Sequence, residues 1–173
     1  MPGVSGWEGY VHMIQHKYNK KKQQYTKVNV CSGAAIYGKD GSAWAVSEGF
    51  PELKEYSMMQ EMDDGGEMEV KVNEFQCALG AAGGSRKPSA AGILMGNKKY
   101  VFMKHDQEYQ STYMVTTGGG ATVAQTKKAV VIGFWDKTAE MKSLDGKTLG
   151  IQNAADCGLI VEDMATLLKD QDF

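Results

Sequence analysis

The most regular pattern of hydrophobic positions lies between residues 118 and 136 and predicts the centre of a β-sheet. Its first half alternates between two faces, as an extended chain does. Its second half, residues 129–135, is an unbroken apolar run rich in β-branched and aromatic residues, which is typical of a strand buried on both faces. A helix fits this run poorly because β-branched side chains lose rotamer freedom there. Since residues 126–128 are the only polar link between the two halves, we expect a hairpin or one bent strand pair.

Helical spacing marks both ends of the chain. Ser5 and Glu8 form the pattern of a capping box, and apolar side chains then recur every three or four residues from Trp7 to Tyr18. At the other end, Asp156 is expected to cap a final helix with an apolar stripe. The residues of this stripe are Leu159, Ile160, Met164, Leu167 and Leu168. Each predicted helix therefore has one apolar face to pack on the sheet.

Glycine-containing turns divide other apolar segments into strands. Residues 38–41, Gly-Lys-Asp-Gly, have the composition of a hairpin turn, and residues 96–97, Gly-Asn, mark a second turn. The strands expected around these turns and ahead of the central pair are residues 28–37, 42–46, 91–95, 99–104 and 109–117. Because consecutive strands joined by short turns pair side by side, the sequence predicts an antiparallel sheet.

The segment between the early and late strands is expected to be largely irregular. Residues 50–69 are acidic, with a short helix predicted over residues 52–59 and a flexible tip at residues 63–66. The part around residues 61–69 lacks apolar spacing, so we expect it to be mobile and dispensable for folding. Asn73 then has the position of an N-cap for a short helix that runs through Leu79.

Two further stretches are polar. Residues 17–27 contain Lys20, Lys21 and Lys22, which suit either a solvated loop or a basic contact for phosphate headgroups. The solvated loop is the favoured interpretation, because short charge runs usually face water. Residues 139–150 are predicted to form a second polar loop.

The composition is that of an ordinary globular protein. The 173 residues are enough for one domain with a real core, and 42% hydrophobic and 23% charged residues are usual values. We therefore expect a single domain over residues 1–173. A net charge of −2 argues against nucleic-acid binding. The 11 methionines are scattered, which favours core filling over a copper site.

The cysteine usage fits a reducing compartment, and the lengths of the apolar runs bear on membrane spanning. Cys31, Cys77 and Cys157 are odd in number and far apart, so neither a zinc site nor a disulfide framework is expected. The N-terminus lacks a signal-peptide core, and the longest apolar run is too short to span a bilayer. We therefore expect a cytoplasmic protein.

No arrangement of residues predicts an enzyme, a cofactor or a metal site. The three glycines at residues 118–120 are too few for a dinucleotide-binding loop. Residues 146–148, Gly-Lys-Thr, resemble the end of a P-loop, but Met141 stands where its first glycine belongs. His12 and His16 have the spacing of a zinc pair, but the glutamate base and a third ligand are missing, so two surface histidines are favoured.

Aromatic residues remain as candidates for a binding surface. Trp7 and Tyr10 are one helical turn apart, Trp44 lies on an early predicted strand, and Phe173 ends the chain. Aromatic residues at helical spacing usually belong to the core. Aromatic residues so near both ends would more naturally line a surface.

Five segments form an ordered set of sequence motifs. They are residues 5–11 (SGWEGYV), 34–45 (AAIYGKDGSAWA), 95–100 (MGNKKY), 119–133 and 157–168. Each segment is weakly specific alone, but together they span nearly the whole chain in order. This ordered set resembles the profilin family.

The resemblance implies an α/β fold of the α+β type. A central antiparallel sheet would have the N- and C-terminal helices packed on one face and short helices on the other. The chain is longer than typical profilins, and its extra residues fall near 17–27, 57–69 and 139–150. Insertions of this kind resemble those of protist profilins.

The resemblance also implies binding partners. These are monomeric actin, proline-rich proteins such as formins, and phosphoinositide lipids, for a protein of the cytoplasm and cytoskeleton that regulates actin polymerisation. An alternative function is a phosphoinositide-binding signalling module with weak actin binding, which would contact acidic headgroups through residues 17–27.

Site residues follow from the same resemblance. The proline-rich ligand site would consist of Trp7, Tyr10, Trp44, Leu167 and Phe173. The actin site would consist of Lys99, Val101, Met103, Lys104, Thr116, Gly158, Leu159 and Asp163. The lipid contact would consist of Lys20, Lys21 and Lys22.

Both protein-binding sites depart from the family pattern. Leu167 stands where the family often has His or Tyr, and Phe173 lacks the hydroxyl of a common terminal Tyr. We therefore expect proline binding that is present but weaker than in typical members. The strand before residues 118–120 lacks the basic residues that the actin face usually carries, whereas Lys99 and Lys104 on the preceding strand match basic positions of that face.

Overall fold

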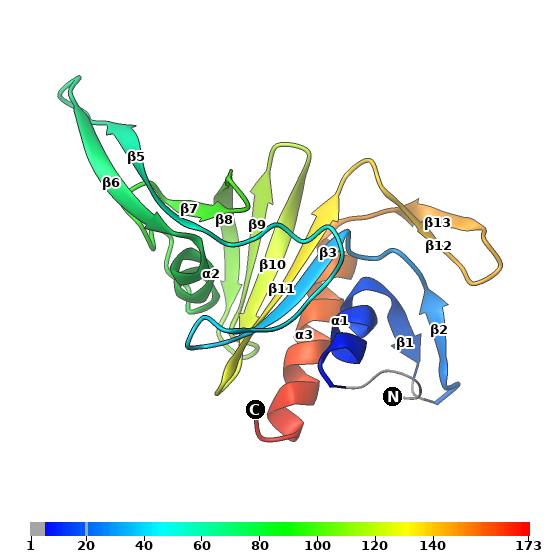
Figure 1. Ribbon diagram of the computed structural model, residues 1–173. Helices are drawn as coiled ribbons and strands as arrows, with labels where there is room; N and C mark the ends of the chain where they lie inside the picture. Colours follow the sequence, from blue (N-terminus) through cyan, green and yellow to red (C-terminus); the bar gives the residue numbers. More distant parts are fainter. Residues whose placement is uncertain (1–5, 20) are drawn as a thin grey trace.

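The computed structural model describes residues 6–19 and 21–173, and its centre is an antiparallel sheet (Figure 1). Seven strands form this sheet in the order β4-β3-β11-β10-β9-β8-β7, and three two-stranded sheets, β1-β2, β5-β6 and β12-β13, lie outside it. In chain order the elements are α1 (Glu8–Gln15), β1 (Lys17–Asn19), β2 (Gln24–Lys27), β3 (Gly33–Gly38), β4 (Ala43–Val46), β5 (Glu55–Glu61), β6 (Glu67–Asn73), α2 (Glu74–Ala82), β7 (Ile93–Met95), β8 (Lys98–Asp106), β9 (Ser111–Thr116), β10 (Gly119–Gln125), β11 (Ala129–Asp136), β12 (Glu140–Lys142), β13 (Thr148–Ile151) and α3 (Ala154–Asp170).

The two central strands, β10 and β11, pair along their whole length. Antiparallel pairing runs from Gly119 opposite Asp136 to the turn, where the Thr126 amide donates to the Ala129 carbonyl at 2.8 Å. Most side chains of both strands are buried. The predicted strand pair is therefore confirmed as a hairpin, and it forms the middle of the sheet.

Alternating side chains of these central strands divide the core into two layers. Val123 and Ile132 pack in the layer that contains α2, whereas Ala124 and Val131 pack with α1 and α3. The N- and C-terminal helices therefore share one face of the sheet, and α2 covers the other (Figure 1). This arrangement confirms the expected α/β fold, and it follows from the period of two along each strand.

Three cysteines are buried in these layers as free thiols. Cys31, which precedes β3, has its sulfur 3.4 Å from the sulfur of Cys157 on α3. Both sulfurs lie close to Gly133, where a Cβ atom would be 3.2 Å from Cys157 Sγ. Hydrogen bonding to Cys157, together with burial, raises the pKa of the Cys31 thiol well above its ordinary value. This thiol therefore stays protonated at neutral pH.

The N-terminal helix is shorter than the sequence predicts. α1 ends at Gln15, and Tyr18 lies on β1 instead of on the helix. The solvated loop predicted at residues 17–27 is also wrong, because β1 and β2 form a hairpin there. Tyr18 packs edge-on against Tyr25 across this hairpin, with ring centroids 5.1 Å apart. This aromatic pair stabilises the two short strands.

Helix caps differ from the predicted ones at both ends of the chain. Trp7 holds the N-cap position of α1 without a side-chain hydrogen bond, and Ser5 of the predicted capping box lies outside the described residues. α3 is capped by Asn153, which accepts from the Asp156 amide at 2.9 Å, so the capping role predicted for Asp156 is wrong. The predicted cap at Asn73 on α2 is confirmed.

The acidic segment after β4 is a two-stranded arm that projects from the body of the fold (Figure 1). β5 and β6 pair from Glu55 opposite Asn73 to Glu61 opposite Glu67, so the helix predicted at residues 52–59 is wrong. The arm is held at its base by apolar residues that contact the core: Tyr56, Met58, Val70 and Val72.

The polar loop predicted at residues 139–150 is a hairpin as well. β12 and β13 pair with Glu140 opposite Ile151, and Met141 of β12 is buried in the core. The stretches at residues 17–27, 57–69 and 139–150 thus all contribute to strand pairs. The seven-stranded sheet is therefore not interrupted by them.

A buried carboxylate joins the arm to the body of the fold. Glu74, the first residue of α2, is only 1% exposed. Its Oε1 accepts from the Lys54 amide at 2.9 Å. Its Oε2 accepts from the Asn97 amide at 2.8 Å and from the Tyr56 hydroxyl at 3.1 Å. The segment before β5, the strand β5 and the β7–β8 turn are therefore fixed by one side chain.

Deleting residues 62–67 is expected to change the unfolding midpoint by no more than about 2 °C. The tip is exposed, and its turn is closed locally by a hydrogen bond from the Met62 amide to the Gly66 carbonyl, so the deletion shortens the arm without opening the core. Thermal unfolding followed by circular dichroism measures the effect. Val72→Ala at the base of the arm, where Val72 is 1% exposed, is the contrasting variant and should lower the midpoint by several degrees. A comparable loss from the deletion would show that the tip packs against the body.

Candidate binding surfaces

Four aromatic side chains from distant parts of the chain meet at one surface. We call Trp7, Tyr10, Trp44 and Phe173 the aromatic cluster. Trp7 and Tyr10 come from the start of α1, Trp44 from the edge strand β4, and Phe173 from the chain end after α3. The Trp7 ring stacks on the Trp44 ring with centroids 4.6 Å apart, and it meets the Phe173 ring edge-on at 4.8 Å. The fold thus brings together four of the five residues predicted to bind proline-rich ligands.

Contacts around the aromatic cluster fix its rings. The Tyr10 hydroxyl donates to Gln171 Oε1 at 2.9 Å, which ties α1 to the end of α3. The Phe173 amide donates to the Leu168 carbonyl at 2.9 Å, and the Lys128 ammonium lies 5.6 Å from the Phe173 ring centroid. All four rings are partly exposed. Rigid, partly exposed aromatic faces suit an extended apolar ligand.

Leu167, the fifth residue predicted for this site, lies in a neighbouring groove. We call it the side groove; it has a volume of about 300 Å³ and lies between α3 and the segment from the end of α1 into β1. Its lining residues are Met13, Lys17, Tyr18, Ile160, Asp163, Met164, Thr166, Leu167 and Asp170. The predicted site is therefore divided between two surfaces along the same pair of helices.

The residues predicted to contact actin lie on β8, at the end of β9 and on α3. Large apolar side chains among them, Val101, Met103 and Leu159, have more than half of their surface exposed. The pairing of β8 with β9 shifts at Met103, which marks a β-bulge there. The full predicted set is Lys99, Val101, Met103 and Lys104 on β8, Thr116 on β9, and Gly158, Leu159 and Asp163 on α3. Exposed apolar side chains beside lysines are typical of a protein–protein interface.

Tyr113 on β9 links these elements, although the sequence did not single it out. The Lys104 ammonium lies 4.5 Å from the Tyr113 ring centroid, and the Tyr113 hydroxyl donates to Glu162 Oε1 at 2.9 Å. Burial, followed by the hydrogen bond to Glu162, raises the pKa of Tyr113. The ring packs so closely on α3 that a Cβ atom at Gly158 would lie 2.2 Å from it. A glycine inside a helix is the sequence signal that marks such a close approach.

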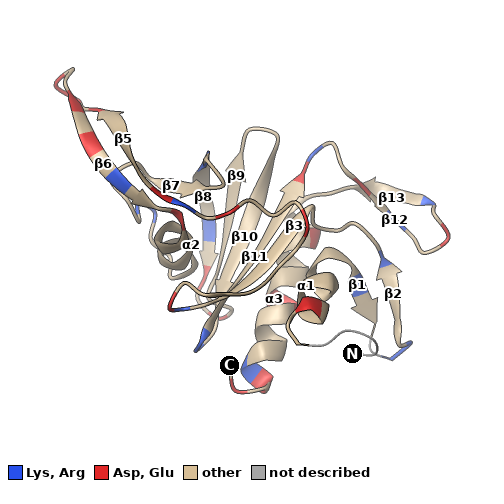
Figure 2. Cartoon of the chain, in the orientation of Figure 1, with Lys and Arg blue, Asp and Glu red and all other residues tan. Residues whose placement is uncertain are grey.

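The lysines predicted to contact lipid headgroups lie at the tip of the β1–β2 hairpin. Lys21 and Lys22 are exposed, and the Lys22 amide donates to Asn19 Oδ1 at 3.0 Å, whereas Lys20 lies outside the described residues. Figure 2 shows Lys or Arg positions on this hairpin, and Asp or Glu positions along the β5–β6 arm. Across residues 6–19 and 21–173, no helix combines the length and the apolar character that a bilayer crossing demands.

The two histidines of the N-terminal segment hold the β1–β2 hairpin. The Tyr25 hydroxyl lies 3.2 Å from His12 Nδ1, and the Asn29 amide donates to His16 Nδ1 at 2.9 Å. Burial, followed by the charge of His12, lowers the pKa of His16. His16 therefore accepts its hydrogen bond as a neutral ring at physiological pH.

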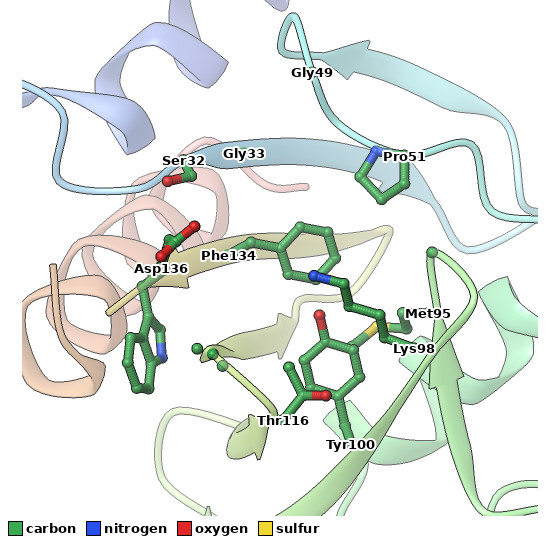
Figure 3. A pocket seen from close by; sticks show the side chains of 15 residues that line it. Ser32, Gly33, Gly49, Pro51, Met95, Lys98, Tyr100, Thr116, Phe134 and Asp136 are labelled. Atoms are coloured by element: carbon green, nitrogen blue, oxygen red, sulfur yellow. The ribbon is translucent and has the colours of Figure 1, made fainter. Parts of the chain in front are cut away.

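A separate cavity of about 270 Å³ opens where β8, β10 and β11 meet the loop after β4. Lys98 and Tyr100 point toward the ring of Phe134, and Asp136 lies on its other side (Figure 3). Trp135 Nε1, at the cavity wall, is buried without a hydrogen-bond partner. Because Lys98 and Asp136 bring opposite charges, the cavity favours neither sign of ligand charge. This cavity was not predictable from the sequence, because its walls come from several separate segments.

Comparisons with known proteins agree on one family. The model of the family described as Profilin matches residues 5–173. A profilin of Tetrahymena pyriformis is 31% identical over 173 residues, which cover 98% of this chain and 100% of that protein. Among solved structures, Acanthamoeba castellanii profilin II is similar with a TM-score of 0.60 at 20% identity, covering 97% of this chain and 100% of that one. Mouse profilin IIa, in complex with a double repeat from the FH1 domain of mDia1, is similar with a TM-score of 0.58 at 17% identity, covering 98% of this chain and 100% of that one.

Proposed function

We propose, from the premise that this chain belongs to the profilin family, that it binds monomeric actin and proline-rich proteins and so regulates actin polymerisation. In this proposal the chain is a single domain over residues 1–173 and acts in the cytoplasm and at the cytoskeleton as a binding protein, without a catalytic role or a cofactor. The observation that carries the proposal is the aromatic cluster, because its four rings are close enough to form one continuous surface.

The aromatic cluster has the chemistry to hold a polyproline II helix. Such a helix is preformed in proline-rich chains, so little entropy is lost when its proline rings pack between flat aromatic faces. Trp7 and Trp44 also carry indole N–H groups, which can donate to the ligand carbonyls that proline chains leave unpaired. The mouse profilin IIa structure with an FH1 repeat supports a proline-rich partner such as a formin. Because Phe173 has no hydroxyl and Leu167 lies in the side groove, we expect weaker binding than in typical members.

The actin surface in this proposal is the exposed face of β8 together with the end of β9 and the start of α3. Val101, Met103 and Leu159 supply apolar area, and Lys99 and Lys104 supply positive charge. Tyr113 holds β9 against α3 between them. A titration of monomeric actin with the purified protein tests the function directly, with inhibited spontaneous polymerisation as the supporting outcome.

Reversing two charges, Lys99→Glu with Lys104→Glu, is expected to slow association with actin and to change its salt dependence. Exposed lysines steer encounter and add modest affinity, so the association rate should fall by about tenfold at low salt and by less at high salt. Stopped-flow fluorescence with labelled actin measures the rate.

The matched control places the same charge reversal at two exposed lysines on other elements, Lys39→Glu with Lys142→Glu. This control should leave the association rate near that of the parent protein. Equal rates for the parent and the Lys99–Lys104 variant would remove these two lysines from the actin surface.

A phosphoinositide-binding signalling module with weak actin binding is the second candidate function. The observation that favours it is the exposure of Lys21 and Lys22 at a hairpin tip, where they would reach a membrane surface first. Co-sedimentation with phosphoinositide-containing vesicles, compared with retention on a proline-rich resin, separates the two functions. Strong vesicle binding with no retention on the resin would favour the lipid module.

A further inference from the structure

The side groove has the walls of a peptide-binding subsite. Its floor is formed by Ile160 and Met164 of α3, both at least 90% buried. Met13 and Tyr18 form one wall, and Leu167 contributes to the other. Met13 lies on α1 and Tyr18 on β1, so this wall combines the first helix with the β1–β2 hairpin.

The side groove continues the surface of the aromatic cluster along α1 and α3. On α1, Trp7 and Tyr10 belong to the cluster, and Met13 lines the groove. On α3, Asp170 lines the groove, and the next residue, Gln171, accepts the Tyr10 hydroxyl hydrogen bond. The distance from Trp7 to Met13 along a helix is about 9 Å, which a polyproline II chain covers in about three residues. A ligand seated on the cluster therefore reaches the groove with its flanking residues.

The charge of the side groove favours a cation. Its lining includes two acids, Asp163 and Asp170, and one base, Lys17. In the part of the chain that the structure describes, neither carboxylate has a basic nitrogen within 4.0 Å. Partial burial raises the pKa of Asp163, and Lys17 offsets only part of that effect. A basic side chain from a ligand would therefore find two carboxylates that no ion pair already engages.

We propose that the side groove is a second subsite for the proline-rich ligand, and that it selects a lysine or arginine about three residues beyond the prolines on the aromatic cluster. The stem of such a side chain packs on Met13 and Leu167, and its charged end lies between Asp163 and Asp170. This inference rests on the proposed function, since it assigns a flanking contact to a ligand held by the cluster. It predicts that the protein discriminates among proline-rich sequences by the charge of their flanks.

The test compares blocked octaproline with the same peptide carrying two arginines or two glutamates, at either end, by isothermal titration calorimetry in low salt. One arginine-flanked peptide is expected to bind about fivefold more tightly than octaproline, and the glutamate-flanked peptide more weakly. The preference should shrink in 0.5 M salt because the carboxylates are exposed at the groove rim. Equal affinities for the three flank types would overturn the subsite.

Variants of the groove carboxylates, compared with a control variant, test whether the preference for arginine flanks arises in the side groove. Asp163→Asn with Asp170→Asn should abolish the arginine preference and leave the affinity for plain octaproline within about twofold. The control Asp172→Asn removes an exposed carboxylate beside Phe173 but outside the groove, and it should keep the preference. If Asp172→Asn removed the preference as fully as the groove variant, the selection would come from general charge and the inference would fail. If octaproline itself did not bind, the proposed function would fail instead, so the two results are distinguishable.

Discussion

Replacing Trp7 with alanine is expected to raise the dissociation constant for octaproline about thirtyfold or more. Trp7 is the centre of the aromatic cluster, with ring centroids 5.3 Å from Tyr10, 4.6 Å from Trp44 and 4.8 Å from Phe173. Truncating a central aromatic anchor of an interface often costs about 2 kcal/mol or more, which corresponds to a thirtyfold change in affinity. Calorimetry measures the loss, and the remaining tryptophan fluorescence, to which Trp44 and Trp135 contribute, shows whether any ligand still reaches the surface.

The fold is expected to survive this change, because α1 is held mainly by other side chains. Val11 and Ile14 are buried in the layer shared with α3, whereas Trp7 is partly exposed. Tyr109→Ala is a matched control, since it removes an exposed aromatic ring from a turn away from the cluster, and it should leave binding unchanged. Undiminished octaproline binding by the Trp7→Ala protein would mean that the four rings serve packing alone.

The largest loss of stability is expected from Glu74→Ala, at about 3 kcal/mol or more. The substitution removes the acceptor of three hydrogen bonds at once and leaves the Lys54 and Asn97 amides and the Tyr56 hydroxyl without this partner. A buried donor left unsatisfied costs about 1–3 kcal/mol, and the missing side chain also leaves a cavity under the arm. Urea unfolding followed by circular dichroism measures the free energy of unfolding.

Two comparison variants separate the hydrogen bonds from other effects of the Glu74 substitution. Glu74→Gln keeps one acceptor oxygen and nearly the same volume, so its loss of stability should be intermediate. Glu69→Ala changes an exposed glutamate on the same arm and should alter the free energy of unfolding by less than about 0.5 kcal/mol. A Glu74→Ala protein as stable as the Glu69→Ala protein would show that the buried carboxylate does not hold the arm.

The parts of the fold that the sequence predicted correctly are those set by local pattern. The run at residues 129–135 is apolar at every position, a pattern that predicts a strand buried on both faces. β11 is buried in this way over most of its length. The turn at residues 38–41 was also predictable, because Gly41 adopts a positive φ of 90° that few other residues tolerate. α3 buries Ile160, Met164 and Leu168 of its predicted apolar stripe, whereas Leu159 of that stripe is 55% exposed.

The hairpins β1–β2, β5–β6 and β12–β13 were not predicted, because their stability comes from pairing between residues of two different strands. In the arm, Tyr56 and Met58 alternate with polar residues on β5, but the face they form is completed only by Val70 and Val72 of β6. A single strand of this kind has too few apolar positions to stand out from an irregular loop. The cap of α3 was assigned to the wrong residue for a different reason, since Asn and Asp at that helix start are equally good caps.

The binding surfaces were predictable only in part. Resemblance to a family placed Trp44 and Phe173 in one site, although nothing local to either residue says that they meet. The same resemblance grouped Leu167 with the rings, and the structure places it in the side groove that continues their surface, together with Tyr18 of β1. Tyr113 carried no signal of its own, because its role depends on the missing side chain at Gly158 in another element.

The burial of all the native thiols makes this protein well suited to site-specific chemical labelling. Cys31, Cys77 and Cys157 each have no exposed surface, so a maleimide reagent cannot approach them while the chain is folded. A cysteine introduced at Asp64, on the exposed tip of the arm, would then be the thiol that reacts. A fluorophore attached there would leave the aromatic cluster and the face of β8 uncovered, so the labelled protein could report on its partners in solution or inside cells.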